Sequence, residues 1–276
     1  GHQVKLMPPH YVKPYVKRNK NDMADAEAIC ESVTRPTMRF VSVKSMEQQS
    51  VLMLHRTRNL LVRQRTMLIN AIRAHMAEFG IVAPGGVPQV NKLLSIIADT
   101  DDARLPLIAR TCLESLARQF LSLHEEIHAA EKHIHAWHRS NEASRRLETI
   151  PGIGPIIASA MAASITDPEV FKNGRELAAW IGLVPRQNST GGKQRLGKIS
   201  KQGDQYLRWL LVAGAMSVIQ HAKRRGSTNI PWLADIIARK PTKVAAVALA
   251  NKNARIVWAL LRQGGTYQKP VIVPAA

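Results

Sequence analysis

The sequence predicts a mainly α-helical fold, and two observations carry that prediction. Two long stretches, residues 46–79 and about 105–147, repeat apolar residues at steps of three and four, which is the period of one helix face. After Glu148 the chain reads as several shorter helices separated by glycine and proline. Only short extended segments, at residues 2–7 and 34–45, interrupt this pattern.

The first expected helix covers residues 21–32, with Asn21 as its N-cap. Asp22 and Asp25 lie three residues apart and therefore share one face of it. Two carboxylates on one face can hold a hard divalent cation such as Mg²⁺, although phosphodiester chemistry usually draws on more ligands than two. The alternative is an acidic first turn that favours the helix dipole. Taken alone, the pair favours this plainer interpretation.

The two long stretches predict two long amphipathic helices. The seam of the first is expected to contain Val51, Leu54, Arg58, Leu61, Arg65, Leu68, Ile72 and Phe79. The heptad seam of the second is expected to contain Leu116, Phe120, Leu123, Ile127, Ala130, Ile134 and Trp137. Two such helices predict an antiparallel coiled-coil hairpin, or a pairing between subunits. The alternative is the core of an ordinary helical bundle.

The charge balance points to a polyanionic partner. Thirty-nine Lys and Arg residues against 20 Asp and Glu residues give a formal net charge of +19. Such a surplus repels itself unless a polyanion screens it, and nucleic acid is the simplest polyanion. A generically basic protein and a membrane-surface binder are the alternatives. The absence of a long apolar run and of a signal peptide, with only Cys30 and Cys112, indicates a cytoplasmic protein that does not span a membrane.

The segment "IPGIG", residues 150–154, predicts a helix-hairpin-helix clamp on a nucleic-acid backbone. Gly152 and Gly154 leave backbone N–H groups open to a phosphate, and the next helix adds the positive end of its dipole. The alternative is a plain turn between two helices, where glycine is also common. The net charge of the chain favours the clamp.

Residues 186–203 read as a long, polar, basic loop. Its candidate ligands for nucleic acid are Arg186, Gly191, Gly192, Lys193, Arg195, Lys198 and Lys201. Ser189 or Thr190 in this loop could attack phosphorus if an activating group is supplied. The alternative is a mobile surface loop whose serine only hydrogen-bonds a turn. From the loop chemistry alone, that alternative is favoured.

Four motifs together resemble one family. They are "KNDMADAEAI", "RTRNLLVRQRTMLINAIRAHMAEFGI", "ETIPGIGPIIASAMAASI" and "LAAWIGLVPRQNSTGGKQRLGKISKQGDQYLRWLLVAGA". In type, order and spacing they resemble the DEDD-type transposases of bacterial insertion sequences, namely insertion sequence family 110 and its 1111-like branch, described as bridge-RNA-guided recombinases. The resemblance covers nearly the whole chain.

The resemblance implies a fold in three parts. Residues 1–45 would be the C-terminal part of a RuvC-like, RNase-H-type α/β domain. Residues 46–146 would be a coiled-coil arm that joins protomers into a dimer or tetramer. Residues 147–276 would be a helical transposase domain with the helix-hairpin-helix and the serine loop.

The resemblance also implies a chemistry. Four acidic residues would bind Mg²⁺, and Asp22 and Asp25 match the last two of them. Ser189 matches the serine that attacks DNA and becomes covalently linked to it, with Thr190 as the nearest alternative hydroxyl. A guide RNA would choose the DNA sequence. The protein would work in the bacterial cytoplasm, associated with the nucleoid.

The first two acidic residues have no match in this chain, because nothing before Asp22 is acidic. They are expected upstream of Gly1, so the chain is interpreted as an N-terminally truncated transposase that is inactive alone. Two alternatives remain open. One is a non-catalytic remnant that still binds nucleic acid, and the other is a metal-dependent, structure-specific nuclease that has no use for Ser189.

Overall fold

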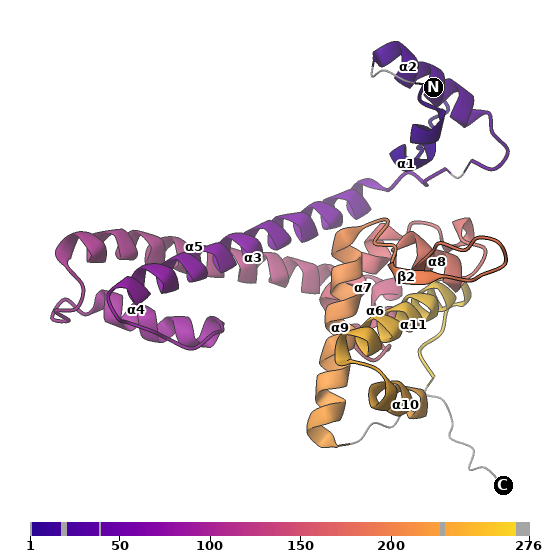
Figure 1. Ribbon diagram of the computed structural model, residues 1–276. Coiled ribbons are helices and arrows are strands. Elements are labelled where there is room, and N and C mark those ends of the chain that lie inside the picture. Colours follow the sequence, from indigo (N-terminus) through magenta and orange to yellow (C-terminus); the bar gives the residue numbers. More distant parts are fainter. Residues whose placement is uncertain (1, 18–20, 39, 227–229, 269–276) are drawn as a thin grey trace, which may run out of the picture. The chain divides into compact units, whose positions relative to one another are not determined.

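The computed structural model of the chain describes residues 2–17, 21–38, 40–226 and 230–268. These residues are mainly helical, which confirms the predicted fold class, and their strands form one small two-stranded sheet (Figure 1). The chain divides into two compact units. Residues 50–137 form one, and residues 1–49 together with 138–276 form the other.

The N-terminal residues contain α1 (Pro9–Val12), the short 3₁₀ helix η1 (Lys13–Tyr15) and α2 (Asp22–Val33). Asn21 caps α2 as predicted, because its side-chain oxygen accepts a hydrogen bond from the Ala24 N–H at 2.7 Å. The extended segment at residues 2–7 forms no regular strand here. It makes an isolated bridge in which the Val41 N–H donates to the Leu6 carbonyl at 2.8 Å. The RuvC-like character of this part stays a prediction.

The unit of residues 50–137 is built on two long antiparallel helices, α3 (Met46–Glu78) and α5 (Leu107–Ser140). Arg58 Nε donates to Glu131 Oε1 at 2.9 Å, and Arg65 Nη1 lies 3.4 Å from His124 Nδ1. Seven residues forward along α3 therefore correspond to seven residues back along α5. This is the register of two antiparallel helices whose facing side chains repeat every heptad. The supercoil of a coiled-coil arm stays a prediction.

The core of this unit lies where α3 and α5 meet α4 (Val90–Ala98), a helix that the sequence pattern did not predict. Its buried residues are Ile69, Ile72, Met76, Ile81, Val90, Leu93, Ile97, Leu105, Leu113 and Phe120. On α5 the predicted seam is largely correct, since Phe120, Ile127, Ala130 and Ile134 are buried. On α3 the predicted Val51 and Ile72 are buried, whereas the predicted Phe79 is 37% exposed. Ile69 and Met76, which the predicted seam omits, are buried as well. Ile69, Ile72 and Met76 all belong to the cluster that includes residues of α4.

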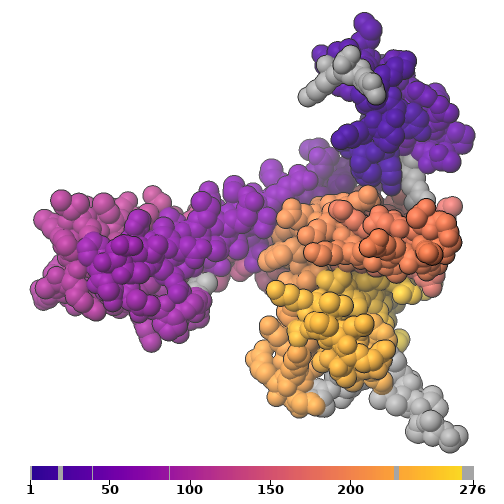
Figure 2. All heavy atoms as spheres, viewed as in Figure 1, coloured from indigo at the N-terminus to yellow at the C-terminus, as the bar shows by residue number. Residues whose placement is uncertain are grey.

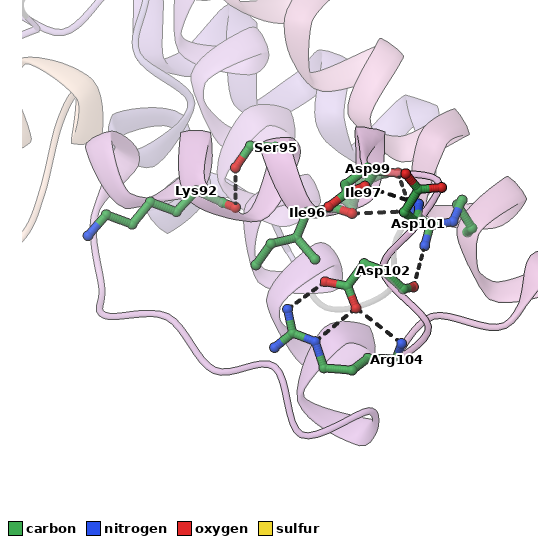
Figure 3. Close-up of polar contacts among 9 residues, drawn as sticks. Lys92, Ser95, Ile96, Ile97, Asp99, Asp101, Asp102 and Arg104 are labelled. Carbon is green, nitrogen blue, oxygen red and sulfur yellow. Dashed lines mark hydrogen bonds and ion pairs between the residues drawn. The ribbon is translucent and has the colours of Figure 1, made fainter.

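Beyond α4 the chain is fixed by a buried guanidinium. Arg110 donates from Nη1 to the carbonyls of Ile96 and Ile97, at 3.2 and 2.8 Å, and from Nη2 to that of Asp102 at 2.7 Å. Figure 3 shows Asp102 paired in turn with Arg104, whose Nε lies 2.9 Å from Asp102 Oδ1. That pairing holds the pKa of Asp102 at about 2. Arg110 thus satisfies carbonyls at the end of α4 that the helix leaves without partners.

The remaining helices follow α5. They are α6 (Glu142–Glu148), α7 (Pro155–Ser164), η3 (Pro168–Val170), α8 (Gly174–Trp180), α9 (Gln205–Arg225), α10 (Pro231–Arg239) and α11 (Thr242–Gln263). The single helix predicted to reach Leu147 is broken at Asn141, because the Asn141 side chain accepts from the Ser144 N–H at 2.8 Å and starts α6. An N-cap of this kind supplies the partner that the first turn of a new helix requires.

Helix α11 is the centre of this unit. It packs against α9 and α8, which both precede it in the sequence. Among the described residues it is the one helix long and apolar enough to cross a membrane by length and composition. A core helix passes the same test, and α11 buries Ala245, Leu249, Ala254 and Val257 inside the unit. Packing inside the unit therefore accounts for part of its apolar composition, since 39% of its apolar stretch is buried.

Candidate nucleic-acid interface

The basic segment after α8 is a β-hairpin, and this corrects the expected long loop. Strands β1 (Pro185–Gln187) and β2 (Leu196–Ile199) pair antiparallel, and the Asn188 N–H donates to the Arg195 carbonyl at 2.9 Å. The tip closes where the Lys193 N–H donates to the Thr190 carbonyl at 3.1 Å. Gly191 and Gly192 have φ values of 54° and 76°. Two consecutive positive φ values are what a tight hairpin turn requires, and glycine adopts them without strain.

Ser189 lies on this hairpin with its hydroxyl held by two donors. Gln187 Nε2 donates to Ser189 Oγ at 3.1 Å, and the Arg195 N–H donates to the same oxygen at 3.2 Å. Ser189 is exposed. Both bonds use lone pairs of the oxygen, so its own proton is left free to be removed. The sequence pattern alone does not identify Gln187 as a partner of Ser189. It lies two residues before Ser189, however, and residues two apart in an extended chain have their side chains on the same side.

The hairpin offers no base for the Ser189 proton. Residues 185–203 contain no Asp, Glu or His. The next carboxylate along the chain, Asp204, is engaged in capping α9, accepting from the Tyr206 N–H at 2.7 Å. A nucleophilic Ser189 would therefore need a proton acceptor, or an ion that lowers its pKa, from another part of the assembly.

The base of the hairpin is firmly tied to the helices behind it. Arg208 Nη1 on α9 donates to the Ile181 and Gln202 carbonyls at 2.9 and 2.8 Å. Asn251 Nδ2 on α11 donates to the Leu183 carbonyl at 3.2 Å. The Ser200 N–H donates to the Val184 carbonyl at 2.8 Å. A hairpin anchored in this way presents its tip from a fixed base.

The five predicted cations all lie exposed on or beside this hairpin: Arg186, Lys193, Arg195, Lys198 and Lys201. None forms an ion pair with a residue of the described chain. In Figure 2 the orange hairpin segment lies at the surface of the unit. An acid-free group of exposed cations attracts phosphate and releases counterions when it binds.

The two glycines of "IPGIG" have different surroundings. A Cβ on Gly152 would lie 2.8 Å from the Gly214 carbonyl oxygen and 2.7 Å from Val218 Cγ2, and its φ is +85°. Gly154 is exposed, a Cβ there would meet nothing within 4 Å, and it is the N-cap of α7 without a side-chain cap. Packing against α9 thus requires glycine at position 152. The phosphate clamp stays a prediction, and Gly154 with the start of α7 is its accessible part.

The carboxylate pair lies on the first turn of α2, with Asp22 exposed and Asp25 half-buried. Within the described chain neither carboxylate has a hydrogen-bond or ion-pair partner. The other acids of α2 do have partners. Glu27 lies 2.5 Å from Lys17 Nζ and raises the pKa of that lysine, and Glu31 pairs with Arg35.

The pair fits only part of a magnesium site. Its oxygens are the hard ligands that Mg²⁺ prefers, and they are not neutralised by a described cation. Among the described residues, however, no group of three or more His, Cys, Asp or Glu side chains could hold a metal ion. Asp22 and Asp25 would be two ligands of a larger set.

A basic helical unit that displays a serine hairpin, together with an acidic turn that has no partner among the described residues, is typical of one class of protein: proteins that act on nucleic acid. Two family profiles match the chain. The profile described as "Transposase IS116/IS110/IS902 family" matches residues 144–229, and the DEDD transposase profile of the IS110 group matches residues 1–81.

Similar proteins agree with these profiles. A "Probable family 20 transposase" of Pseudomonas aeruginosa is 48% identical over 269 residues, which cover 97% of this chain and 80% of the relative. The transposase for insertion sequence element IS1328 of Yersinia enterocolitica is 41% identical, over 98% of this chain and 80% of its own length. The transposase for IS1111A of Coxiella burnetii is 41% identical, over 97% and 74%.

The chain belongs to the IS116/IS110/IS902 family of transposases, as its motifs indicated. Similarity to the IS1111A and IS1328 transposases also agrees with the 1111-like branch. A general role in the transposition of an insertion sequence follows from this membership.

Proposed function

We propose that this transposase cuts and rejoins DNA through a covalent link between Ser189 and a DNA phosphate. The observation that supports this most directly is the hydroxyl of Ser189, which is exposed and accepts hydrogen bonds from Gln187 and the Arg195 N–H on a hairpin rich in cations. Two donors at the oxygen stabilise negative charge that develops when the proton leaves.

The proposed step balances as follows. Ser189 Oγ attacks the phosphorus, and a new Oγ–P bond forms while the bond from phosphorus to the 3′-oxygen breaks. The 3′-oxygen leaves with a proton, and the Ser189 proton passes to a base outside the hairpin. Attack by the 3′-hydroxyl of another strand on the phosphoserine reverses the step, joins the new strands and restores the serine.

Asp22 and Asp25 would contribute oxygen ligands to Mg²⁺ in this assembly. A bound Mg²⁺ ion supplies charge neutralisation at a phosphate. The residues of this chain add the cations Arg186, Lys193 and Arg195, which would hold the phosphates on either side of the attacked one.

The partners follow from the same proposal. Gly154, Gly191, Gly192, Lys198 and Lys201 would add backbone and phosphate contacts to DNA or RNA. A guide RNA would choose the sequence, so the protein itself would need few contacts with base edges. The protein would act as a dimer or tetramer joined through the α3–α5 arm, in the cytoplasm on the nucleoid.

The test is to trap the covalent adduct. The full-length protein is incubated with insertion-sequence-end DNA, its RNA and Mg²⁺, and protein–DNA adducts are resolved under denaturing conditions. Ser189→Ala is expected to abolish the adduct and Thr190→Ala to retain it. An adduct that persists in Ser189→Ala and is lost in Thr190→Ala would move the nucleophile to Thr190.

Two further outcomes distinguish the alternatives. Strand cleavage without an adduct, unaffected by Ser189→Ala, would identify a metal-dependent nuclease. Nucleic-acid binding with neither cleavage nor adduct would identify a binding protein without chemistry of its own.

A further inference from the structure

A groove beside the hairpin combines cationic side chains and two indole rings with an apolar floor that includes Leu183, Val244, Val247 and Ile256. It has a volume of about 1570 Å³ and is lined by residues from α8, the hairpin, α10 and α11. In Figure 1, α11 lies between the hairpin and α10. Pockets for small molecules are usually smaller, about 300–1,000 Å³, so the size of this groove suits an extended polymer.

The charges along the groove are of one sign. Its lining contains six cationic side chains, namely Arg175, Lys198, Lys201, Lys243, Lys252 and Arg255. Among the described residues no carboxylate lines it. The acids nearest in sequence are engaged elsewhere: Glu176 accepts from the Lys172 N–H at 2.7 Å, Asp204 caps α9, and Asp235 pairs with Arg239. A groove with cations and no acids is complementary to a chain of phosphates.

Two indole rings lie in the same groove. Lys252 Nζ is 4.4 Å from the centroid of the half-buried Trp232 ring. Trp258 is fixed, because its Nε1–H donates to the Pro168 carbonyl at 3.0 Å. The Lys252 ammonium lies over the face of the Trp232 ring, so a base that stacks on this face would displace it toward the phosphate of the same nucleotide. Cationic grooves that carry aromatic rings are typical of proteins that bind single strands.

We propose that this groove binds a single-stranded nucleic acid, with Trp232 as a stacking platform and Lys243 and Lys252 on the phosphates. The β2 side of the hairpin leads from the groove to the serine. Lys198 on β2 lines the groove, and the backbone N–H of Arg195, directly before β2, donates a hydrogen bond to Ser189 Oγ. A strand in the groove would continue along the hairpin to Ser189. That continuation rests on the proposed function, whereas binding in the groove does not.

The experiment measures binding of labelled oligonucleotides of about 20 nucleotides to the full chain by fluorescence anisotropy over a range of salt concentrations. Single-stranded DNA, single-stranded RNA of the same sequence and the DNA duplex are compared. The Lys243→Gln/Lys252→Gln variant is set against Arg224→Gln/Arg225→Gln, which removes the same charge from exposed positions at the end of α9, outside the groove.

When a variant no longer neutralises one phosphate of a single strand, the slope of log K against log salt concentration becomes smaller in magnitude by about 0.7. The groove variant is therefore expected to lose about 1.4 in slope, and about 25-fold in affinity at about 0.1 M salt. The control is expected to change affinity by less than about threefold, since its charges would not touch the strand. A stronger preference for DNA or for RNA identifies which strand occupies the groove.

Stacking has its own test. Trp232→Leu keeps an apolar side chain for packing but removes the ring, and is expected to weaken single-strand binding about fivefold or more. Trp232→Phe is expected to recover most of the affinity. Equal losses in the lysine variant and its control, or an equal loss for duplex, would overturn the proposal. The binding assay is repeated with Ser189→Ala, which lacks the proposed nucleophile. If this variant still binds single strands but forms no adduct in the denaturing assay, binding in the groove does not depend on the serine chemistry. Failure of one proposal can then be told apart from failure of the other.

Discussion

Gly152 and Gly214 meet backbone to backbone. A Cβ on Gly214 would lie 2.0 Å from the Gly152 carbonyl oxygen, and a Cβ on Gly152 would lie 2.8 Å from the Gly214 oxygen. The turn before α7 therefore packs directly on α9, closer than any side chain allows. Asn253 of α11 holds the same turn, since its Nδ2 donates to the Pro151 carbonyl at 3.0 Å.

Replacing Gly152 is expected to destabilise the protein while leaving its ligand-binding groups in place. Gly152→Ala would force a side chain into the α9 backbone and into a positive φ, at a cost of about 2–4 kcal/mol in the free energy of unfolding. Gly154→Ala is the matched control, since it lies in open space, and is expected to change that free energy by less than about 0.5 kcal/mol. Urea unfolding of both variants provides the measurement. Equal stabilities would show that the close approach is absent in solution.

Arg110 is expected to be a determinant of stability in the unit of residues 50–137. Arg110→Met keeps the apolar stem but leaves three carbonyls without their donor. The expected loss is about 2–4 kcal/mol, because buried acceptors without partners are costly. Arg104→Gln, which removes the exposed partner of Asp102, is expected to lose less than about 1 kcal/mol. A neutral Arg110→Met variant would contradict the capping role.

The stability of the protein is expected to fall between about pH 6.5 and pH 4 because of His55. Burial, and then the nearby charge of Arg58, lowers the pKa of His55 from 6.5 to about 4. The unfolded chain thus binds a proton in this range while the folded chain does not, so stability is full above the unfolded pKa and is lost as pH falls. Between about pH 7.5 and pH 5, the free energy of unfolding is expected to fall by about 2 kcal/mol because of His55.

The measurement is urea unfolding at several pH values, with His55→Gln as the comparison. Gln carries no titrating group, so the variant is expected to lose less stability between about pH 7.5 and pH 5 than the natural chain. The comparison uses only the slope of the free energy of unfolding against pH, because the substitution also changes the stability at pH 7.5. Identical slopes would assign the pH dependence to other groups.

The parts of the fold that local rules govern were predictable from the sequence. Asn21 capped α2 as expected, and the seam from Phe120 to Ile134 is buried as its heptad spacing indicated. Where a third helix packs on a pair, local spacing identifies only part of the buried face. On α3 the predicted Ile72 is buried together with Ile69 and Met76, which the predicted seam omits, and all three share a core with α4, a helix that the pattern does not predict.

The candidate site shows the same limit. The residue types identify the cations and Ser189, but the sequence pattern predicts a loop where the structure has the hairpin that arranges them. The pair Gly191-Gly192 was the available signal, since consecutive glycines between short extended segments favour a tight hairpin turn. The groove beside the hairpin combines residues from Arg175 to Arg255. No spacing rule connects residues so far apart, so only the fold brings them together.

The last prediction concerns Gln187, whose Nε2 donates to Ser189 Oγ at 3.1 Å. Gln187→Ala removes one of the two donors that orient the hydroxyl and is expected to slow adduct formation roughly tenfold to hundredfold, with DNA affinity unchanged. Gln194→Ala is the matched control, because Gln194 is exposed on the same hairpin and makes no hydrogen bond to a described residue. Rates are taken from the denaturing adduct assay, and affinities from anisotropy. Equal rates for the two variants would mean that the Arg195 N–H alone orients Ser189. Weaker DNA binding by Gln187→Ala would mean that Gln187 contacts the DNA directly.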